Sequence, residues 1–219
     1  MALIHRTTMR PTKQELVAAW LPTREWYVPG TGEVRPVAVG GFRLDDPAGE
    51  VGVEFMAVAD GEGPDAVVYL VPMTYRGKPL DGAEGALIGT SEHGVLGTRW
   101  IYDGAHDPVL VAQAYALLAG RAAAQHRSLS DTPDPTVTAV LDPAPGGDAE
   151  ALDIVDGADR TDVRLRTDGS GTALVLRFHR VLRPAETGAG AGAVGRVTAA
   201  WTPGGGSPVR GDFLTVHPV

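Results

Sequence analysis

The sequence contains no cysteine, and Lys13 and Lys78 are the only lysines among its 219 residues. Without cysteine the chain can form no disulfide and no Cys-ligated zinc or iron–sulfur site, so packing alone must hold the fold, as in a cytoplasmic protein. No apolar run approaches the ~18 to 20 residues that a membrane helix requires, and the N-terminus lacks the apolar core of a signal peptide. We therefore expect a soluble cytoplasmic protein with no membrane partner.

The charge balance is strongly acidic. The formal net charge is −8 at pH 7, which argues against a nucleic-acid partner, because that binding needs a basic face that releases counterions. Hydrophobic residues make up 43% of the sequence and can supply the core of one large domain or two small ones. A self-folding globular protein is therefore expected.

The motifs that mark phosphate-binding loops and hydrolase nucleophiles are missing as well. No Gly-x-Gly-x-x-Gly or Walker pattern stands between a predicted strand and a predicted helix, and the sequence has no Gly-x-Ser-x-Gly. The glycines between residues 77 and 104 are better explained by turns and close packing. The sequence predicts no catalytic residue, no cofactor and no cofactor-binding residue.

The N-terminal region begins with a predicted short strand over residues 2–7, followed by a helix with a clear start signal. Thr12 and Glu15 have the spacing of a capping box, in which each side chain bonds a backbone amide near the other residue. Pro22 stops the helix. The apolar stripe that we expect this helix to bury consists of Leu16, Ala19 and Trp20.

Three long strand patterns follow, over residues 34–44, 50–59 and 66–75, with turn-forming residues between them. Their alternation of apolar and other residues predicts an antiparallel meander that is half-buried. After a long glycine-spaced loop, residues 99–102 form another predicted strand. Asp107-Pro108 then begins a helix of about 18 residues, because aspartate is a good N-cap and proline suits the first helical position.

The second half contains strand signals but no helix signal. Pro, Gly and Asp dominate residues 128–150, where only residues 136–141 are expected to be extended, and we place a subdomain boundary there. Residues 186–193 are of low complexity. Two hairpins of a small sheet are predicted from the strand patterns over residues 163–166, 173–182, 196–202 and 209–216.

Three motifs in the first part of the chain resemble the N-terminal cap of actinobacterial maltokinases: Trp20-Leu-Pro22, Val71-Pro-Met-Thr-Tyr75 and the strand-to-helix passage from Tyr102 to Leu118. The resemblance covers residues 1–130. It implies an α+β fold in which a curved antiparallel sheet wraps around a long helix, a cystatin-like cap. Residues 131–219 are then expected to form a smaller antiparallel β-subdomain, which we interpret as a possible remnant of the kinase N-lobe.

Leu176-Arg-Phe-His-Arg-Val-Leu-Arg-Pro184 matches a strand motif of the maltokinase N-lobe, with Arg177 in place of a lysine and His179 in place of an aromatic residue. The family's lysine acts on a nucleotide phosphate, and a planar guanidinium is not equivalent to it. Phosphoryl transfer also needs metal ligands and a catalytic carboxylate, which the family carries on a further lobe. We therefore expect no complete kinase and no enzyme, with residual activity as the remaining alternative.

His93, Asp103 and His106 lie within fourteen residues of one another and invite a metal or acid–base interpretation. A metal site needs at least three converging ligands, and this spacing does not fix convergence. We expect no metal here. Asp107 is instead expected to cap the helix with His106 packed beside it.

Aromatic residues and arginines concentrate in the first half of the chain, a combination that suits sugar binding as well as core packing. The candidate ligand or partner contacts are Trp26, Tyr75, Arg76, His93, Arg99, Trp100, Asp103 and His106. The leading hypothesis is a non-catalytic cap-like protein that binds or regulates a partner enzyme of α-glucan or trehalose metabolism. The alternative is a protein that binds a sugar or sugar phosphate, and an exposed edge strand would also permit a homo-oligomer.

Overall fold

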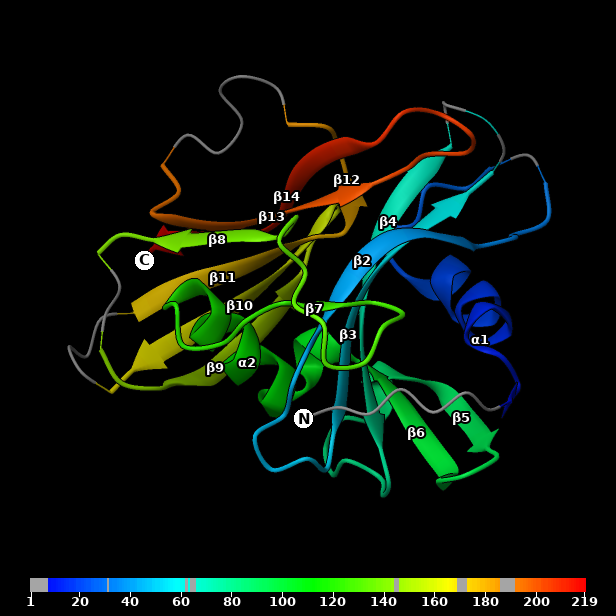
Figure 1. Cartoon of the computed structure of the whole chain (residues 1–219), viewed down its shortest axis with the longest axis horizontal. Helices are drawn as coiled ribbons and strands as arrows, with labels where there is room; N and C mark the ends of the chain where they lie inside the picture. The colour runs from blue at the N-terminus through cyan, green and yellow to red at the C-terminus, as the bar shows by residue number, and fades with distance from the viewer. Residues whose placement is uncertain are drawn as a thin grey trace.

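Antiparallel strands make up most of the fold (Figure 1). The computed structural model describes residues 8–30, 32–61, 63, 66–143, 146–168, 173–185 and 192–219. The predicted strand over residues 2–7 and most of the predicted low-complexity segment lie outside these residues. No helix in the described part of the chain is long and apolar enough to cross a membrane.

The strands follow one another through the whole chain, and the helices are few and short. The strands are β1 (Met9–Arg10), β2 (Val37–Leu44), β3 (Gly52–Asp60), β4 (Val67–Arg76), β5 (Leu87–His93), β6 (Gly97–Asp103), β7 (Gln125–His126), β8 (Thr138–Leu141), β9 (Ala149–Asp156), β10 (Arg160–Thr167), β11 (Ala173–His179), β12 (Val181–Leu182), β13 (Gly195–Trp201) and β14 (Val209–Pro218). The α-helices are α1 (Lys13–Trp20) and α2 (Pro108–Leu118), and the 3₁₀ turns are η1 (Leu21–Thr23), η2 (Glu84–Ala86) and η3 (Gly104–His106).

All the strands belong to one curved sheet with the order β1-β5-β6-β4-β3-β2-β13-β14-β11-β10-β9, to which β7, β8 and β12 are added at the side. The two halves of the chain meet where β13 pairs with β2 through Trp201 and Gly40. A Cβ atom at Gly40 would lie 2.6 Å from Trp201 Cβ and 2.7 Å from the Ala200 carbonyl oxygen, so only glycine allows this close approach. The predicted meander is confirmed, because β2, β3 and β4 are antiparallel neighbours.

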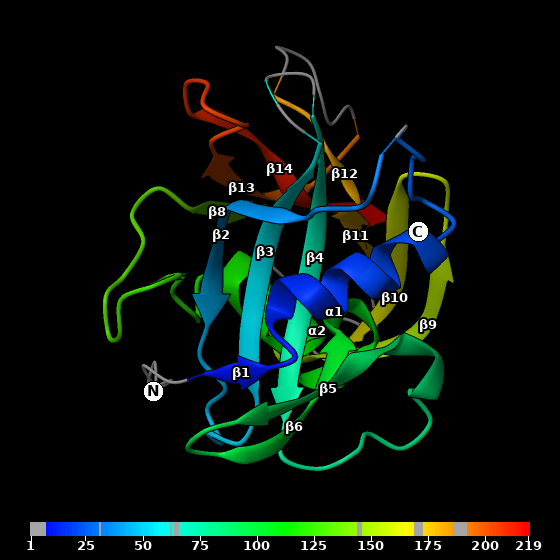
Figure 2. The same ribbon diagram turned by 90° about the vertical axis from the view of Figure 1, so that its right-hand side faces the viewer.

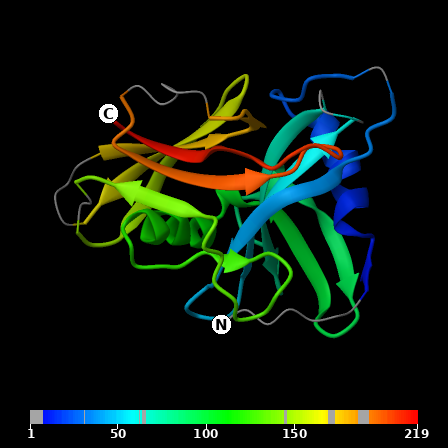
Figure 3. The ribbon, with the colours of Figure 1, turned by 45° about the horizontal axis from the view of Figure 1, so that its top comes forward.

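The first-half strands are covered on both faces, because α1 and α2 lie on opposite sides of them (Figure 2). The alternating residues Phe55 and Ala57 of β3 point into a core with α2, whereas Met56 and Val58 point into a second core with α1. The alternation was thus predicted well, but the half-buried character was wrong, since β3 is buried over most of its length. The core around α2 also contains side chains of β10, β11, β13 and β14, so it is shared by both halves. Figure 3 shows α2 beside the strands of the second half.

Helix α1 begins as predicted. The Thr12 side chain accepts a hydrogen bond from the Glu15 amide, and Glu15 accepts one from the Thr12 amide, which completes the capping box. The predicted stripe is partly wrong, because Ala19 is exposed and Val17 is buried in its place with Trp20.

Helix α2 begins at Pro108 as predicted, with Asp107 as its N-cap. Its predicted length is wrong, since the helix has 11 residues and no long helix is wrapped by the sheet in the described part of the chain. Gly120 has a φ of 70° and the Arg121 amide bonds the Ala116 carbonyl oxygen 2.8 Å away, a glycine C-terminal signal that ends the helix early.

The two predicted hairpins of the second half are present as β10–β11 and β13–β14. Four strands were missed, of which β1 and β7 have two residues each. β5 lies in the segment predicted to be a glycine-spaced loop, and β9 follows the Pro- and Gly-rich segment after Leu141. The subdomain boundary near residue 130 stays a prediction.

Candidate functional site

The turn between β5 and β6 is stabilised by hydrogen bonds from His93 on one side and Arg99 on the other, two of the candidate contact residues. His93 Nδ1 accepts hydrogen bonds from the amides of Val95 and Leu96, at 3.3 and 3.1 Å. Arg99 Nη2 donates to the Leu96 carbonyl oxygen at 2.5 Å. Val95 and Leu96 are nevertheless 62% and 45% exposed. The hairpin tip, residues 93–99, therefore presents two aliphatic side chains on a fixed backbone.

Tyr75 and Trp100 lie beside this hairpin on β4 and β6. The Tyr75 hydroxyl donates to Glu54 Oε2 at 2.7 Å, and Lys13 donates to the same oxygen at 2.8 Å. Burial and the neighbouring Glu54 carboxylate raise the pKa of Tyr75 well above its ordinary value. Trp100 is half-buried opposite Arg76 in the strand register. Tyr75 is thus a structural donor to a buried carboxylate.

Arg76 and Asp107 form a bidentate ion pair. Arg76 Nε and Nη2 each lie 2.6 Å from one oxygen of Asp107, whose side chain is buried. Asp107 Oδ1 also accepts a hydrogen bond from the Val109 amide at the start of α2. The hydrogen bonds to Asp107 raise the pKa of Arg76 above its ordinary value. The pair therefore fixes the start of α2 to the end of β4.

A second set of paired side chains, which we call the buried seam, links η3 to the second half. Arg180, which is 0% exposed, donates from Nη2 to Asp103 Oδ2 at 2.6 Å and from Nε to Thr161 Oγ1 at 2.7 Å. Thr161 in turn donates to Asp156, and His106 Nε2 lies 3.9 Å from Asp156 Oδ2. The predicted residues Asp103 and His106 are therefore brought together as structural partners, with no metal cluster among the described residues.

Trp26 belongs to the core around α1. Its ring lies 5.6 Å from the ring of Trp20 and 5.9 Å from that of Tyr69, and the Arg180 guanidinium carbon lies 5.0 Å from its centroid. The side chain is 1% exposed. Trp26 therefore packs between α1 and the buried seam, away from the hairpin tip.

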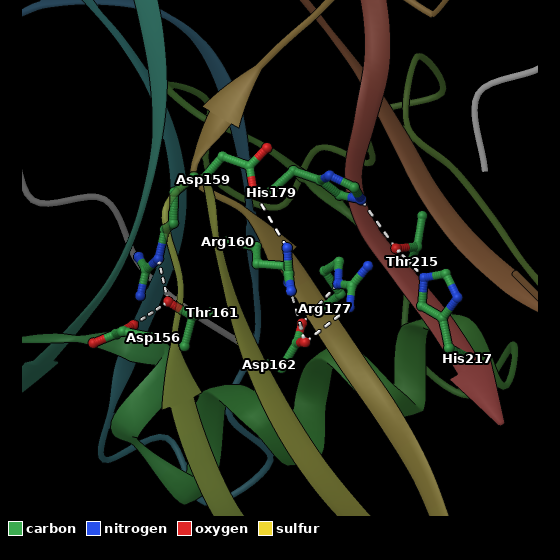
Figure 4. A network of polar contacts seen from close by, with 10 residues as sticks. Asp156, Asp159, Arg160, Thr161, Asp162, Arg177, His179, Thr215 and His217 are labelled. Atoms are coloured by element: carbon green, nitrogen blue, oxygen red, sulfur yellow. Dashed lines mark hydrogen bonds and ion pairs between the residues drawn. The ribbon is translucent and has the colours of Figure 1, made fainter. Parts of the chain in front are cut away.

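On the outer face of the second-half sheet, Asp162 of β10 and Arg177 of β11 form a bidentate pair with distances of 2.7 and 2.8 Å (Figure 4). Burial alone raises the pKa of Asp162, but the Arg177 hydrogen bonds and charge more than reverse this and hold it below its ordinary value. Arg160 Nε lies 3.3 Å from Asp162 Oδ2 and its Nη1 lies 3.6 Å from Asp159 Oδ1. Arg177, which the kinase resemblance placed at a phosphate, is thus occupied by a carboxylate of its own chain.

Beside this pair, one hydroxyl is shared by two histidines. Thr215 Oγ1 lies 2.9 Å from His179 Nε2 and 3.0 Å from His217 Nε2, and Thr215 itself is buried (Figure 4). Burial lowers the pKa of both imidazoles below the ordinary value, and the Arg177 charge lowers both further. A hydroxyl has one hydrogen and two lone pairs, so it can donate to one imidazole at most, and at least one of the two imidazoles must donate to it.

The eight predicted contact residues fall into separate places. His93 and Arg99 hold the hairpin tip, Asp103 and His106 lie in the buried seam, and Trp26 lies in the core. Sequence reasoning missed Arg180, Thr215 and His217 as members of these arrangements. Outward positions at every second residue of β11 and β14 were readable from the sequence, but the cross-strand register that places His217 beside Thr215 and His179 was not.

The fold and these sites define a mainly antiparallel β protein whose first half is a sheet with helices on both faces. Residues 20–107, from the end of α1 to the N-cap of α2, match the family described as the maltokinase N-terminal cap domain. This match confirms, for residues 20–107, the resemblance noted in the sequence. No protein of curated function matches the chain.

Proposed function

We propose that this is a non-catalytic cytoplasmic protein that binds, and thereby regulates, a partner enzyme of α-glucan or trehalose metabolism. The pathway is suggested by the maltokinase cap domain over residues 20–107. The observation that carries partner binding is the hairpin tip, where Val95 and Leu96 are exposed on a turn fixed by His93 and Arg99. Exposed aliphatic side chains on a fixed backbone lose little entropy on binding, which favours an interface.

The other ionisable residues of the first half support binding over chemistry. Asp103 and Asp107 are buried and each is bonded by an arginine, while Tyr75 donates to Glu54. Groups engaged in this way stabilise the fold. We therefore assign recognition of the partner protein to the hairpin tip.

Capture of partners from a native lysate tests the proposal. The tagged full chain should recover an enzyme that acts on an α-glucan or on trehalose, identified by mass spectrometry. The double variant V95S/L96S should lose this enzyme while its unfolding free energy stays within about 0.5 kcal/mol of the parent, because both side chains are exposed. Val155→Ser changes an equally exposed aliphatic residue on β9 and should keep the enzyme.

Recovery of no such enzyme across a range of salt concentrations would refute the proposed partner. Equal recovery by V95S/L96S would refute the role of the hairpin tip.

Two alternatives stay predictions. For a sugar or sugar phosphate ligand, thermal shift with maltose, trehalose, their phosphates and ATP is the first test, since a ligand at a hundredfold its dissociation constant adds about 2.7 kcal/mol of stability. For residual enzyme activity, phosphate transfer from ATP to maltose is the direct assay. A homo-oligomer is tested by the mass of the purified protein in solution.

A further inference from the structure

Strand β9 lies at the end of the sheet (Figure 2) and, among the described residues, pairs with β10 only. The Gly157 amide bonds the Arg160 carbonyl oxygen at the hairpin turn, which sets the alternation of paired groups along β9. By this alternation the amide and the carbonyl group of Ile154 point away from β10. The Ile154 amide instead donates to the carboxylate of Asp153, with a nitrogen-to-oxygen distance of 2.9 Å. β9 thus presents an open strand edge, on which a carboxylate takes the place of a neighbouring strand.

Two aliphatic side chains are exposed on β9. Val155 is 57% exposed and Leu152 is 49% exposed. Leu152 lies where the register between β9 and β10 shifts, so the strand is bulged at this residue. A bulge prevents regular pairing along the whole edge, so an added strand can pair continuously only over residues 153–156. The open edge therefore admits a short extended segment with apolar side chains that can pack on Val155.

The charges on the β9 edge have one sign. Residues 148–156 contain no lysine or arginine. Their four carboxylates belong to Asp148, Glu150, Asp153 and Asp156. The neighbouring cations lie on the inner side of the edge, where Arg164 and Arg166 of β10 stand opposite Asp153 and Glu150 in the strand register. Arg121 and His106 approach Asp148 and Asp156, with nitrogen-to-oxygen distances of 3.5 and 3.9 Å.

This arrangement of charges indicates the sign of a further strand. Opposite charges that face each other across neighbouring strands stabilise a sheet, and like charges destabilise it. Arg164 and Arg166 already face the β9 carboxylates from one side. A basic strand on the open edge would face the same carboxylates from the other side.

A second copy of β9 does not fit this edge. It would bring four further carboxylates against those of the first copy, with no lysine or arginine on either strand to match them. Charges of one sign on an edge strand are a common means by which proteins avoid pairing with copies of themselves. The strand that fits the edge is therefore one of a different, basic sequence.

We propose that β9 is a docking edge for a basic extended segment of another protein, in which lysine or arginine alternates with aliphatic residues and which adds to the sheet as a further strand. The Ile154 amide then donates to a backbone carbonyl of the segment, and the Asp153 carboxylate that it releases pairs with a basic side chain. The edge lies on the second half of the chain and does not include the hairpin tip. The proposal therefore goes beyond the proposed function and can hold or fail independently of it.

The test is a titration of the ¹⁵N-labelled full chain with three capped peptides of about seven residues, followed by amide chemical shifts. In the first peptide lysine alternates with valine, and in the second glutamate replaces lysine. In the third the central valine of the first is proline, which keeps the charge but removes a backbone donor. We expect the lysine peptide to bind with a dissociation constant of about 0.1 mM, to shift the amides of residues 149–156 and to slow hydrogen exchange of the Ile154 amide. The other two peptides should bind about tenfold more weakly or less.

Asp153→Lys should weaken binding of the lysine peptide about tenfold, because attraction across the strands becomes repulsion. Asp81→Lys is the matched control. It changes the net charge equally at an exposed residue of the first half and should leave the binding unchanged. If Asp153→Lys does not fold, the comparison of the three peptides on the unaltered chain decides the question.

The proposal is overturned if the lysine peptide does not bind up to about 1 mM, or if the proline peptide binds equally well, which would mean attraction between charges alone. Equal losses of affinity in Asp153→Lys and Asp81→Lys would overturn it too. A dimer of the chain alone that Val155→Ser dissociates would assign the edge to a second copy. Because purified protein and synthetic peptides are used, failure here leaves the capture experiment with V95S/L96S as a separate test of the proposed function.

Discussion

The buried seam and the set of Asp212, Thr215, His179 and His217, which we call the outer-face cluster, contain similar side chains but lie in different surroundings. In the seam, Arg180 is wholly buried, bonds Asp103 and Thr161, and lies against the Trp26 ring. Its Nη1 atom is buried and has no hydrogen-bond partner among the described residues. In the cluster, Asp212 has a buried oxygen without a donor, and one Thr215 hydroxyl serves two histidines. The seam is closed by contacts from both halves of the chain, whereas one sheet face alone supplies the cluster.

This difference separates polar groups enclosed between the two halves of the chain from polar groups on one face of the sheet. A charge pair enclosed by protein on all sides has lost its hydration, so each partner depends on the other. A cluster on one face of a sheet keeps some access to solvent and retains hydrogen-bonding capacity. Removing a single side chain should therefore lower the free energy of unfolding strongly in the seam and only slightly in the cluster.

The largest effect is expected for Arg180→Met, which leaves the Asp103 carboxylate buried without its partner. The free energy of unfolding should fall by about 3 to 5 kcal/mol, measured by urea denaturation. The double variant R180M/D103N removes the remaining charge and should be more stable than R180M alone. A loss below about 1 kcal/mol for R180M would contradict the view that the seam holds the halves together.

A smaller loss is expected at Asp107, where the ion pair is open to solvent on the arginine side. Asp107→Ala removes both the N-cap of α2 and the partner of Arg76, and should lower the free energy of unfolding by about 2 kcal/mol. Asp107→Asn keeps an oxygen that can cap the helix and should cost less. Equal losses for the two variants would show that the ion pair, and not the cap, provides the stability.

The comparison also marks what could be predicted from the sequence. Thr12, Glu15 and Asp107 act within a few residues of their own positions, so the caps they form were readable in advance. Arg180 meets Asp103 across 77 residues, and nothing in either local pattern indicates the pairing. Helix α2 ended early because Gly120 turns the chain, a signal present in the sequence but outweighed there by a long apolar pattern.

β5 and the outer-face cluster show the same limit. β5 contains one glycine, Gly89, and was predicted as part of a glycine-spaced loop, but pairing with β6 and β1 makes it a strand. His179 lies in a predicted strand and His217 one residue beyond another, but their common contact depends on the register between β11 and β14. Local chemistry was therefore predictable, and chemistry assembled by register was not.

The smallest effect should appear as a dependence of stability on pH that arises in the outer-face cluster. Burial lowers the pKa of His179 and His217 in the folded protein, so as pH falls through the ordinary histidine value of about 6.5 the unfolded chain takes up protons first. Stability should consequently be greatest above this pH and decrease below it. Urea denaturation at several pH values between about 5 and 8 measures the slope.

The double variant H179Q/H217Q should flatten this slope, because glutamine keeps polar atoms in place and does not titrate. His106→Gln is the control, because His106 is half-buried beside Asp156 in the seam, away from the cluster. This variant should keep the pH dependence of stability that the cluster causes. If stability instead rises as pH falls, the pKa values of the two imidazoles must be higher in the folded protein than in the unfolded chain. The direction of the pH effect thus shows whether folding favours the neutral or the cationic form of the two histidines.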